Sequence, residues 1–120
     1  MRELPPLEAE PRLLIDGKLA ESRSGRTFEN VNPASEEVIG VCADGTREDM
    51  DAAIAAARRA FDESGWSTDA DFRRRCLLQL HQALGEAREQ LRHVVVAEAG
   101  SPILLTYAVQ VDAYLDEMPY

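Results

Sequence analysis

The chain has 120 residues, of which 45% are hydrophobic and 29% are charged, so it has the size and composition of one ordinary globular domain. Its 13 basic and 22 acidic residues give a net charge of −9, which argues against a protein that binds nucleic acid by neutralising phosphates. No apolar run approaches the roughly 18 residues that cross a bilayer, so we expect no association with a membrane. The chain does not open with a secretory signal, so we expect a cytoplasmic protein whose cysteines are free thiols.

Short strands are predicted between about residues 13 and 43, after a flexible arm at 1–11 that holds three prolines and three glutamates. Asp16-Gly17 lies between two short apolar runs, which is typical of a hairpin with a type I′ turn. Ser24-Gly25 and Asn32-Pro33 add further turns. Val38, Ile39, Val41 and Cys42 supply the apolar content of the last strand.

Apolar residues then recur at helical spacing, and this predicts helices at about 46–63, 69–85, 87–99 and 102–118. Thr46 and Asp49 form a capping box for the first helix. Gly85 predicts a break or kink that separates the second and third helices, and Gly100 predicts the end of the third. Ser101 and Pro102 are expected at the N-cap and first position of the fourth helix.

The fourth predicted helix carries an apolar stripe of Leu104, Ala108, Val111, Leu115 and Met118. No polar tail follows this stripe, and Pro119 is expected to weaken the last turn. We therefore expect residues 12–120 to be a truncated piece of a longer architecture.

Residue chemistry alone shows no active site. Cys42 and Cys76 are far apart, no histidine accompanies either of them, and the spacing of His81 and His93 is not typical of zinc. We interpret both cysteines as small buried hydrophobic residues, and the helix start at Thr46 as at best a weak anion site. We expect no catalytic and no cofactor-binding residue in this chain.

The ordered motifs of the chain resemble the N-terminal part of the NAD(P)-dependent aldehyde dehydrogenases. The resemblance rests on LIDGK at 14–18, SGRTF at 24–28, VNPA at 31–34, VIG at 38–40, the helix at 49–61 followed by Trp66, the run at 75–84, and EAGSP at 98–102. It covers about residues 12–120. Ser101 stands where many members have Lys.

The resemblance implies an α/β parent fold, of which this segment is the outer part of the cofactor-binding domain, mainly α-helical with an N-terminal β-hairpin and short strands. It implies oxidation of an aldehyde to a carboxylic acid with NAD or NADP by the full-length parent, through a catalytic Cys, Asn and Glu that lie beyond this segment. We expect the isolated segment to be inactive and to bind neither cofactor tightly. Its partners would be the remainder of the parent enzyme or other subunits of a homo-oligomer.

The resemblance also implies a monovalent cation site at Asn30, Val31 and Asp112, through backbone oxygens and one carboxylate. Hard cations take such oxygen ligands. The alternative interpretation is an ordinary turn and a helix-surface Asp112.

Two other functions remain open from the sequence. The chain could be a truncated, non-catalytic helical module for binding or assembly, which would pair its apolar stripes with another chain. It could also be a free-standing enzyme that uses Cys42 or Cys76.

Overall fold

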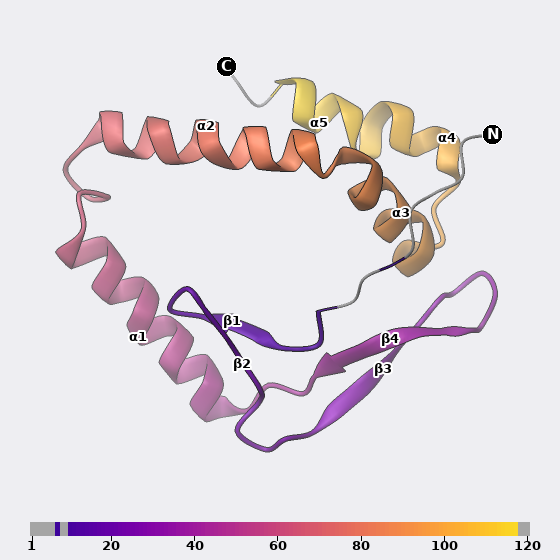
Figure 1. Ribbon diagram of the computed structural model, residues 1–120, viewed down its shortest axis with the longest axis horizontal. Coiled ribbons are helices and arrows are strands. Elements are labelled where there is room, and N and C mark those ends of the chain that lie inside the picture. Colours follow the sequence, from indigo (N-terminus) through magenta and orange to yellow (C-terminus); the bar gives the residue numbers. More distant parts are fainter. Residues whose placement is uncertain (1–6, 8–9, 118–120) are drawn as a thin grey trace. The chain divides into compact units, whose positions relative to one another are not determined.

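The computed structural model describes Leu7 and residues 10–117, and Figure 1 traces their elements in chain order. The strands are β1 (Leu13–Ile15), β2 (Lys18–Ala20), β3 (Thr27–Val31) and β4 (Val38–Ala43). The helical elements are α1 (Arg47–Glu63), α2 (Ala70–Glu86), α3 (Arg88–Ala99), α4 (Ile103–Leu105), the π-helical turn η1 (Thr106–Gln110) and α5 (Asp112–Glu117). The predicted fold, mainly α-helical with an N-terminal β-hairpin and short strands, is confirmed. Most of the predicted arm, together with Met118 and Pro119, lies outside the described residues.

The chain folds as two compact units. The hairpin unit comprises residues 10–30 and Gly40–Arg74, and the helical unit comprises Val31–Ile39 and residues 75–117. The strands form two two-stranded sheets, β1–β2 and β3–β4. No helix of the described chain is long and apolar enough to cross a membrane.

The first hairpin is closed by Asp16-Gly17, as the sequence predicts. Leu13 pairs with Ala20, and Ile15 pairs with Lys18, in an antiparallel register. Asp16 and Gly17 have φ values of 55° and 70°, which are the two positive angles that a type I′ turn requires. This turn thereby fixes the register in which β1 and β2 pair.

The second turn is organised by the side chain of Asn32. Its Oδ1 accepts hydrogen bonds from the backbone N–H groups of Ala34 and Ser35, at 2.8 and 3.3 Å. Its backbone also pairs with Glu36 and Glu37. Asn favours turns because its side chain can substitute for a backbone acceptor in this way.

A capping box begins α1. The Thr46 hydroxyl accepts from Asp49 N at 3.2 Å, and the Asp49 carboxylate accepts from Thr46 N at 2.9 Å. The free N–H groups of the helix start therefore receive side-chain partners. Helix α1 ends at Ser64, its C-cap residue.

The predicted break or kink between the second and third helices is present, but it lies at Ala87, two residues after Gly85. Gly85 remains helical within α2, whereas Ala87 has φ −87° and ψ 7°. Ala87 N still donates to Ala83 O, and Leu91 N still donates to Ala87 O, so the junction bends the helical path without breaking it. At the end of α3, Gly100 adopts φ 63°, the left-handed angle expected of a glycine after a helix.

The stretch predicted as one helix at 102–118 is helical from Ile103 to Glu117, but η1 and Val111 interrupt its α-helical course. Pro102 is the N-cap of α4, so the first helical residue is Ile103, one position later than predicted, and Ser101 is not the N-cap. The Thr106 hydroxyl donates to Ile103 O at 2.6 Å, and Val111 N donates to Thr106 O across the wide turn. A side-chain bond to the preceding turn is a common cause of such irregularity.

The wide turn also explains which apolar residues of this stretch are buried. Each additional residue in a helical turn rotates the following side chains by about 100°. Val111 and Leu115, after η1, are buried, whereas Leu104, before it, is 77% exposed. The described residues of the predicted stripe are therefore not buried together.

Candidate functional site

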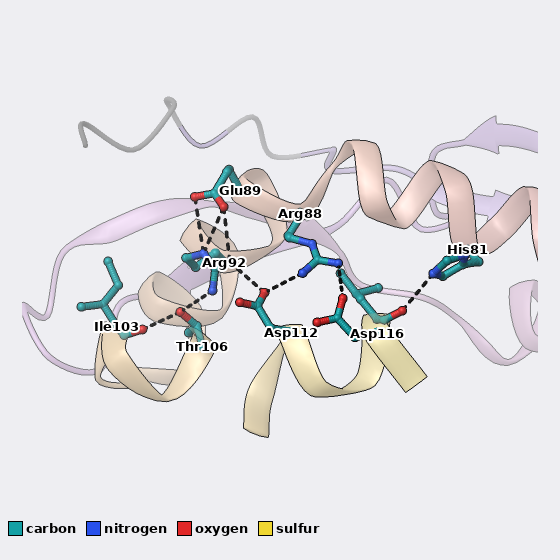
Figure 2. Close-up of polar contacts among 9 residues, drawn as sticks. His81, Arg88, Glu89, Arg92, Ile103, Thr106, Asp112 and Asp116 are labelled. Carbon is teal, nitrogen blue, oxygen red and sulfur yellow. Dashed lines mark hydrogen bonds and ion pairs between the residues drawn. The ribbon is translucent and has the colours of Figure 1, made fainter. Parts of the chain in front are cut away.

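The guanidinium of Arg92 is the centre of the largest polar cluster of the helical unit (Figure 2). Arg92 is only 1% exposed. Its Nη2 donates to Asp112 Oδ1 at 2.8 Å, and its Nη1 donates to the Thr106 hydroxyl at 3.0 Å. Its Nε and Nη2 face the Glu89 carboxylate at 3.3–3.4 Å, and its guanidinium carbon lies 3.7 Å from the ring centre of Tyr107. All three nitrogens thus have acceptors, as a buried guanidinium requires.

The charged residues of this cluster are spaced one helical turn apart on each of two helices, which brings the opposite charges together. Arg88 and Arg92 are one turn apart on α3, and Asp112 and Asp116 are one turn apart on α5. Arg88 donates to Asp112 Oδ1 at 3.2 Å and to Asp116 Oδ1 at 2.7 Å. Asp112 Oδ1 therefore accepts hydrogen bonds from both arginines, which tie α3 to α5.

A contact from α2 completes the attachment of α5. His81 Nε2 donates to the backbone oxygen of Leu115 at 2.9 Å, and Figure 2 shows this contact beside the arginine cluster. His81 thus attaches α5 to α2, and Arg88 and Arg92 attach it to α3.

The acidic partners of Arg92 compensate for the burial of its charge. Burial alone would lower the pKa of Arg92, but its hydrogen bonds to Asp112 and Glu89, and their negative charges, raise this pKa overall. The side chains of Arg92 and Asp112 are 1% and 21% exposed, so water screens this ion pair poorly. The cluster therefore joins the helices through ion pairs and hydrogen bonds.

Asp49 is the centre of a second polar cluster, in the hairpin unit, and it is 6% exposed. Besides its bonds to Thr46, its Oδ2 accepts from the Ser22 hydroxyl at 3.1 Å and from Arg23 N at 3.2 Å. The hydrogen bond from Thr46 N is the main reason why the pKa of Asp49 lies below its ordinary value. Because Asp49 already occupies the N-terminus of α1, the weak anion site considered there is filled by the chain itself.

The predicted cation ligands lie on separate elements. Asn30 and Val31 are the last two residues of β3, and Asp112 is the first residue of α5. The carboxylate of Asp112 accepts from the two arginines described above.

Other candidate chemistry is sparse in the described chain. Cys42 and Cys76 are free and half-buried, rather than fully buried as expected. No group of three or more His, Cys, Asp or Glu side chains in the described part could hold a metal ion. Gln110 Oε1 is the one buried side-chain oxygen or nitrogen there without a hydrogen-bond partner.

An apolar hollow of about 200 Å³ opens between β1 and the start of α1 within the hairpin unit. Its walls come from Leu13, Leu14, Ile15, Gly45, Thr46, Asp49, Met50 and Ala53. Next to it, α1 carries an apolar stripe of Met50, Ile54 and Phe61, whose side chains are 61%, 60% and 45% exposed. The apolar side chains of this surface can pack against a partner but supply no group for catalysis.

The sequence interpretation missed Arg92, Thr106 and Ser22. The paired spacing of Arg88/Arg92 and Asp112/Asp116 is a signal that could have indicated complementary helix faces. No local signal marks Ser22, because its partner Asp49 lies in a different element.

Comparison with known proteins identifies the scaffold to which these clusters belong. The profile described as the aldehyde dehydrogenase family matches residues 19–120. The chain belongs to the aldehyde dehydrogenase family. The expected resemblance is therefore confirmed.

Aldehyde dehydrogenases from distant organisms are similar to this chain. Aldehyde dehydrogenase 1 of Tanacetum cinerariifolium is 36% identical over 100 residues, which cover 82% of this chain and 20% of that protein. A mitochondrial aldehyde dehydrogenase of Leishmania tarentolae is 39% identical over 100 residues, with 83% and 20% coverage. The chain thus spans about a fifth of the length of these curated relatives.

Solved structures of the family have the same fold over this stretch. The NAD+ complex of an aldehyde dehydrogenase from Bacillus cereus matches with a TM-score of 0.83 and 31% identity, over 96% of this chain and 24% of that chain. The betaine aldehyde dehydrogenase of Staphylococcus aureus, in complex with NAD+, matches with a TM-score of 0.78 and 33% identity, over 90% and 21%.

Proposed function

We propose that this aldehyde dehydrogenase segment is the outer, mainly helical part of a cofactor-binding domain and is catalytically silent alone. The observation that carries the proposal is the contrast between its polar and apolar groups. The buried carboxylate of Asp49 and the buried guanidinium of Arg92 are committed to internal hydrogen bonds. Large apolar side chains are instead exposed, as on α1, where Met50 is 61% and Ile54 is 60% exposed.

We propose that the parent enzyme oxidises an aldehyde to a carboxylic acid and passes the hydride to NAD+ or NADP+. The relationship to structures solved with NAD+ supports this proposal. The catalytic groups and the cofactor site would be supplied by residues outside this segment. The remainder of the parent, or its other subunits, would cover the apolar stripe of α1, since exposed apolar patches of this kind mark interaction surfaces.

An activity assay tests catalytic silence directly. The purified chain is mixed with NAD+ or NADP+ and a set of aliphatic and aromatic aldehydes, and reduced cofactor is followed by fluorescence. A complete aldehyde dehydrogenase serves as the positive control. We expect no reduced cofactor from the 120-residue chain. Turnover by the pure chain would refute the proposal, and loss of that turnover in Cys42→Ala or Cys76→Ala would identify the responsible thiol.

A cofactor titration tests the second part of the proposal. Calorimetry with NAD+ and with NADP+ is expected to give no saturable heat, because we place the nucleotide-binding strands outside this segment. A saturable heat with either nucleotide would contradict that assignment.

A non-catalytic helical module for binding or assembly is the second candidate function, and the open stripe of α1 favours it. A module of this kind forms a defined complex through that stripe. Analytical ultracentrifugation of the chain, and of a variant with Met50 and Ile54 changed to Gln, would separate the candidates. A stable complex of fixed stoichiometry that the variant loses favours the module, whereas diffuse association favours an uncovered segment of the enzyme.

We further propose that the parent acts in the cytoplasm as a homo-oligomer. Cell fractionation and light scattering of the whole enzyme test these two points. A membrane-bound fraction would contradict the first, and a monomer would contradict the second.

A further inference from the structure

Asp112 is the one predicted cation ligand that would contribute a charged side chain, and its contacts decide whether it suits that role. Its Oδ1 accepts from Arg92 Nη2 at 2.8 Å and from Arg88 Nη1 at 3.2 Å. Both donors are positively charged, so the carboxylate already has two charge-assisted hydrogen bonds. A monovalent cation on the same carboxylate would be repelled by two guanidinium groups a few ångströms away.

The other charged side chains of the cluster do not offset the repulsion of a cation by Arg88 and Arg92. Glu89 and Asp116 add two more carboxylates, but their side chains are 45% and 66% exposed, and each already pairs with an arginine. Water screens such exposed charges. Asp112, at 21% exposure, faces the buried guanidinium of Arg92 directly.

We propose that Arg92 acts as a built-in cation for Asp112, so that this chain binds no monovalent metal ion at that carboxylate. Arg92 thereby positions Asp112 and, through Thr106, the wide turn η1. The backbone oxygens of Asn30 and Val31 remain predicted cation ligands, but Asp112 would no longer supply the charged ligand. It does not depend on the proposed enzymatic function.

The test compares the unfolding of the chain in potassium, sodium and choline chloride at equal ionic strength. A cation that binds only the folded state raises the folding equilibrium constant by a factor of 1 + [cation]/Kd, which is roughly tenfold at ten times Kd. We expect equal urea midpoints in the three salts. A potassium- or sodium-specific rise of the midpoint that disappears in Asp112→Asn would overturn the proposal.

Two variants at Arg92 separate its charge from its shape. Arg92→Lys keeps the positive charge and should remain insensitive to the choice of cation. Arg92→Met removes the shorter of the two arginine contacts to Asp112 and leaves Arg88 in place, and it should make the midpoint higher in potassium or sodium than in choline. Insensitivity of a folded Arg92→Met, or cation sensitivity of Arg92→Lys, would count against the charge of Arg92 as the cause. If Arg92→Met does not fold, the salt comparison of the unaltered chain with Asp112→Asn still decides the proposal.

Discussion

Arg92 Nη2 donates to Asp112 Oδ1 over 2.8 Å and joins α3 to α5 through a side chain that is almost fully buried. Removal of one partner from such a pair leaves an incompletely compensated charge, which is far more costly than the loss of both. We expect Asp112→Ala to lower the free energy of unfolding by about 3 kcal/mol. Urea denaturation followed by circular dichroism measures this loss.

The double variant Asp112→Ala/Arg92→Met should be more stable than the sum of the two single losses predicts, because neither charge then stays behind. Asp116→Ala is the matched control, since Asp116 pairs with Arg88 at the surface, and it should cost much less. Additive single and double losses would contradict the coupling.

The capping box at Thr46 and Asp49 should be visible in helix content and in acid stability. Thr46→Ala removes the hydroxyl that accepts from Asp49 N, and should cost about 1 kcal/mol. Far-ultraviolet circular dichroism during urea unfolding measures the effect. Thr46→Ser keeps the hydroxyl, so a loss as large as that of Thr46→Ala would show that the cap is not the cause.

The lowered pKa of Asp49 makes stability depend on pH in one direction. The folded state holds the proton of Asp49 less tightly than the unfolded state, so this group stabilises the fold above its unfolded pKa of about 4. That contribution is lost as the pH falls through the lower pKa of the folded state. Asp49→Asn should flatten this part of the acid-unfolding profile. An unchanged profile in a folded Asp49→Asn would contradict the assignment.

Two glycines should respond to alanine with opposite signs. A Cβ at Gly100 would lie 3.0 Å from Pro33 Cγ, at a φ of +63°, so Gly100→Ala should cost at least about 1 kcal/mol. A Cβ at Gly85 would meet nothing within 4 Å in α2, so Gly85→Ala should stabilise the chain by about 0.5 kcal/mol. Thermal unfolding of both variants measures this contrast, and a shift of the same sign would contradict it.

The apolar stripe of α1 should tolerate polar substitution. Met50 and Ile54 are both more than half exposed, so changing both to Gln should alter the free energy of unfolding by no more than about 1 kcal/mol. Binding of a hydrophobic dye should fall, because apolar surface has been removed. Ala56→Gln, at a buried position on the same helix, is the control and should destabilise the chain. Severe unfolding of the Met50/Ile54 variant would show that this stripe belongs to an internal core.

Local signals predicted most of the secondary structure, because the forces behind them act within a few residues. Asp16-Gly17 needs only its own backbone angles to close a hairpin. Thr46 and Asp49 cap α1 across one helical turn. The ordered motifs around these elements also indicated the aldehyde dehydrogenase family, which the comparison confirms.

The tertiary structure decided the features whose partners lie far apart in the chain. Asp49 meets Ser22, and Arg92 meets Thr106 and Asp112, only after the elements have packed, so no local pattern specifies these bonds. The wide turn η1 likewise interrupts a regular apolar stripe, and Thr106 at its start bonds to both Ile103 and Arg92. Sequence periodicity therefore determined where the helices form, whereas the pairing of the buried Arg92 with Asp112 determined how α3 and α5 are held together.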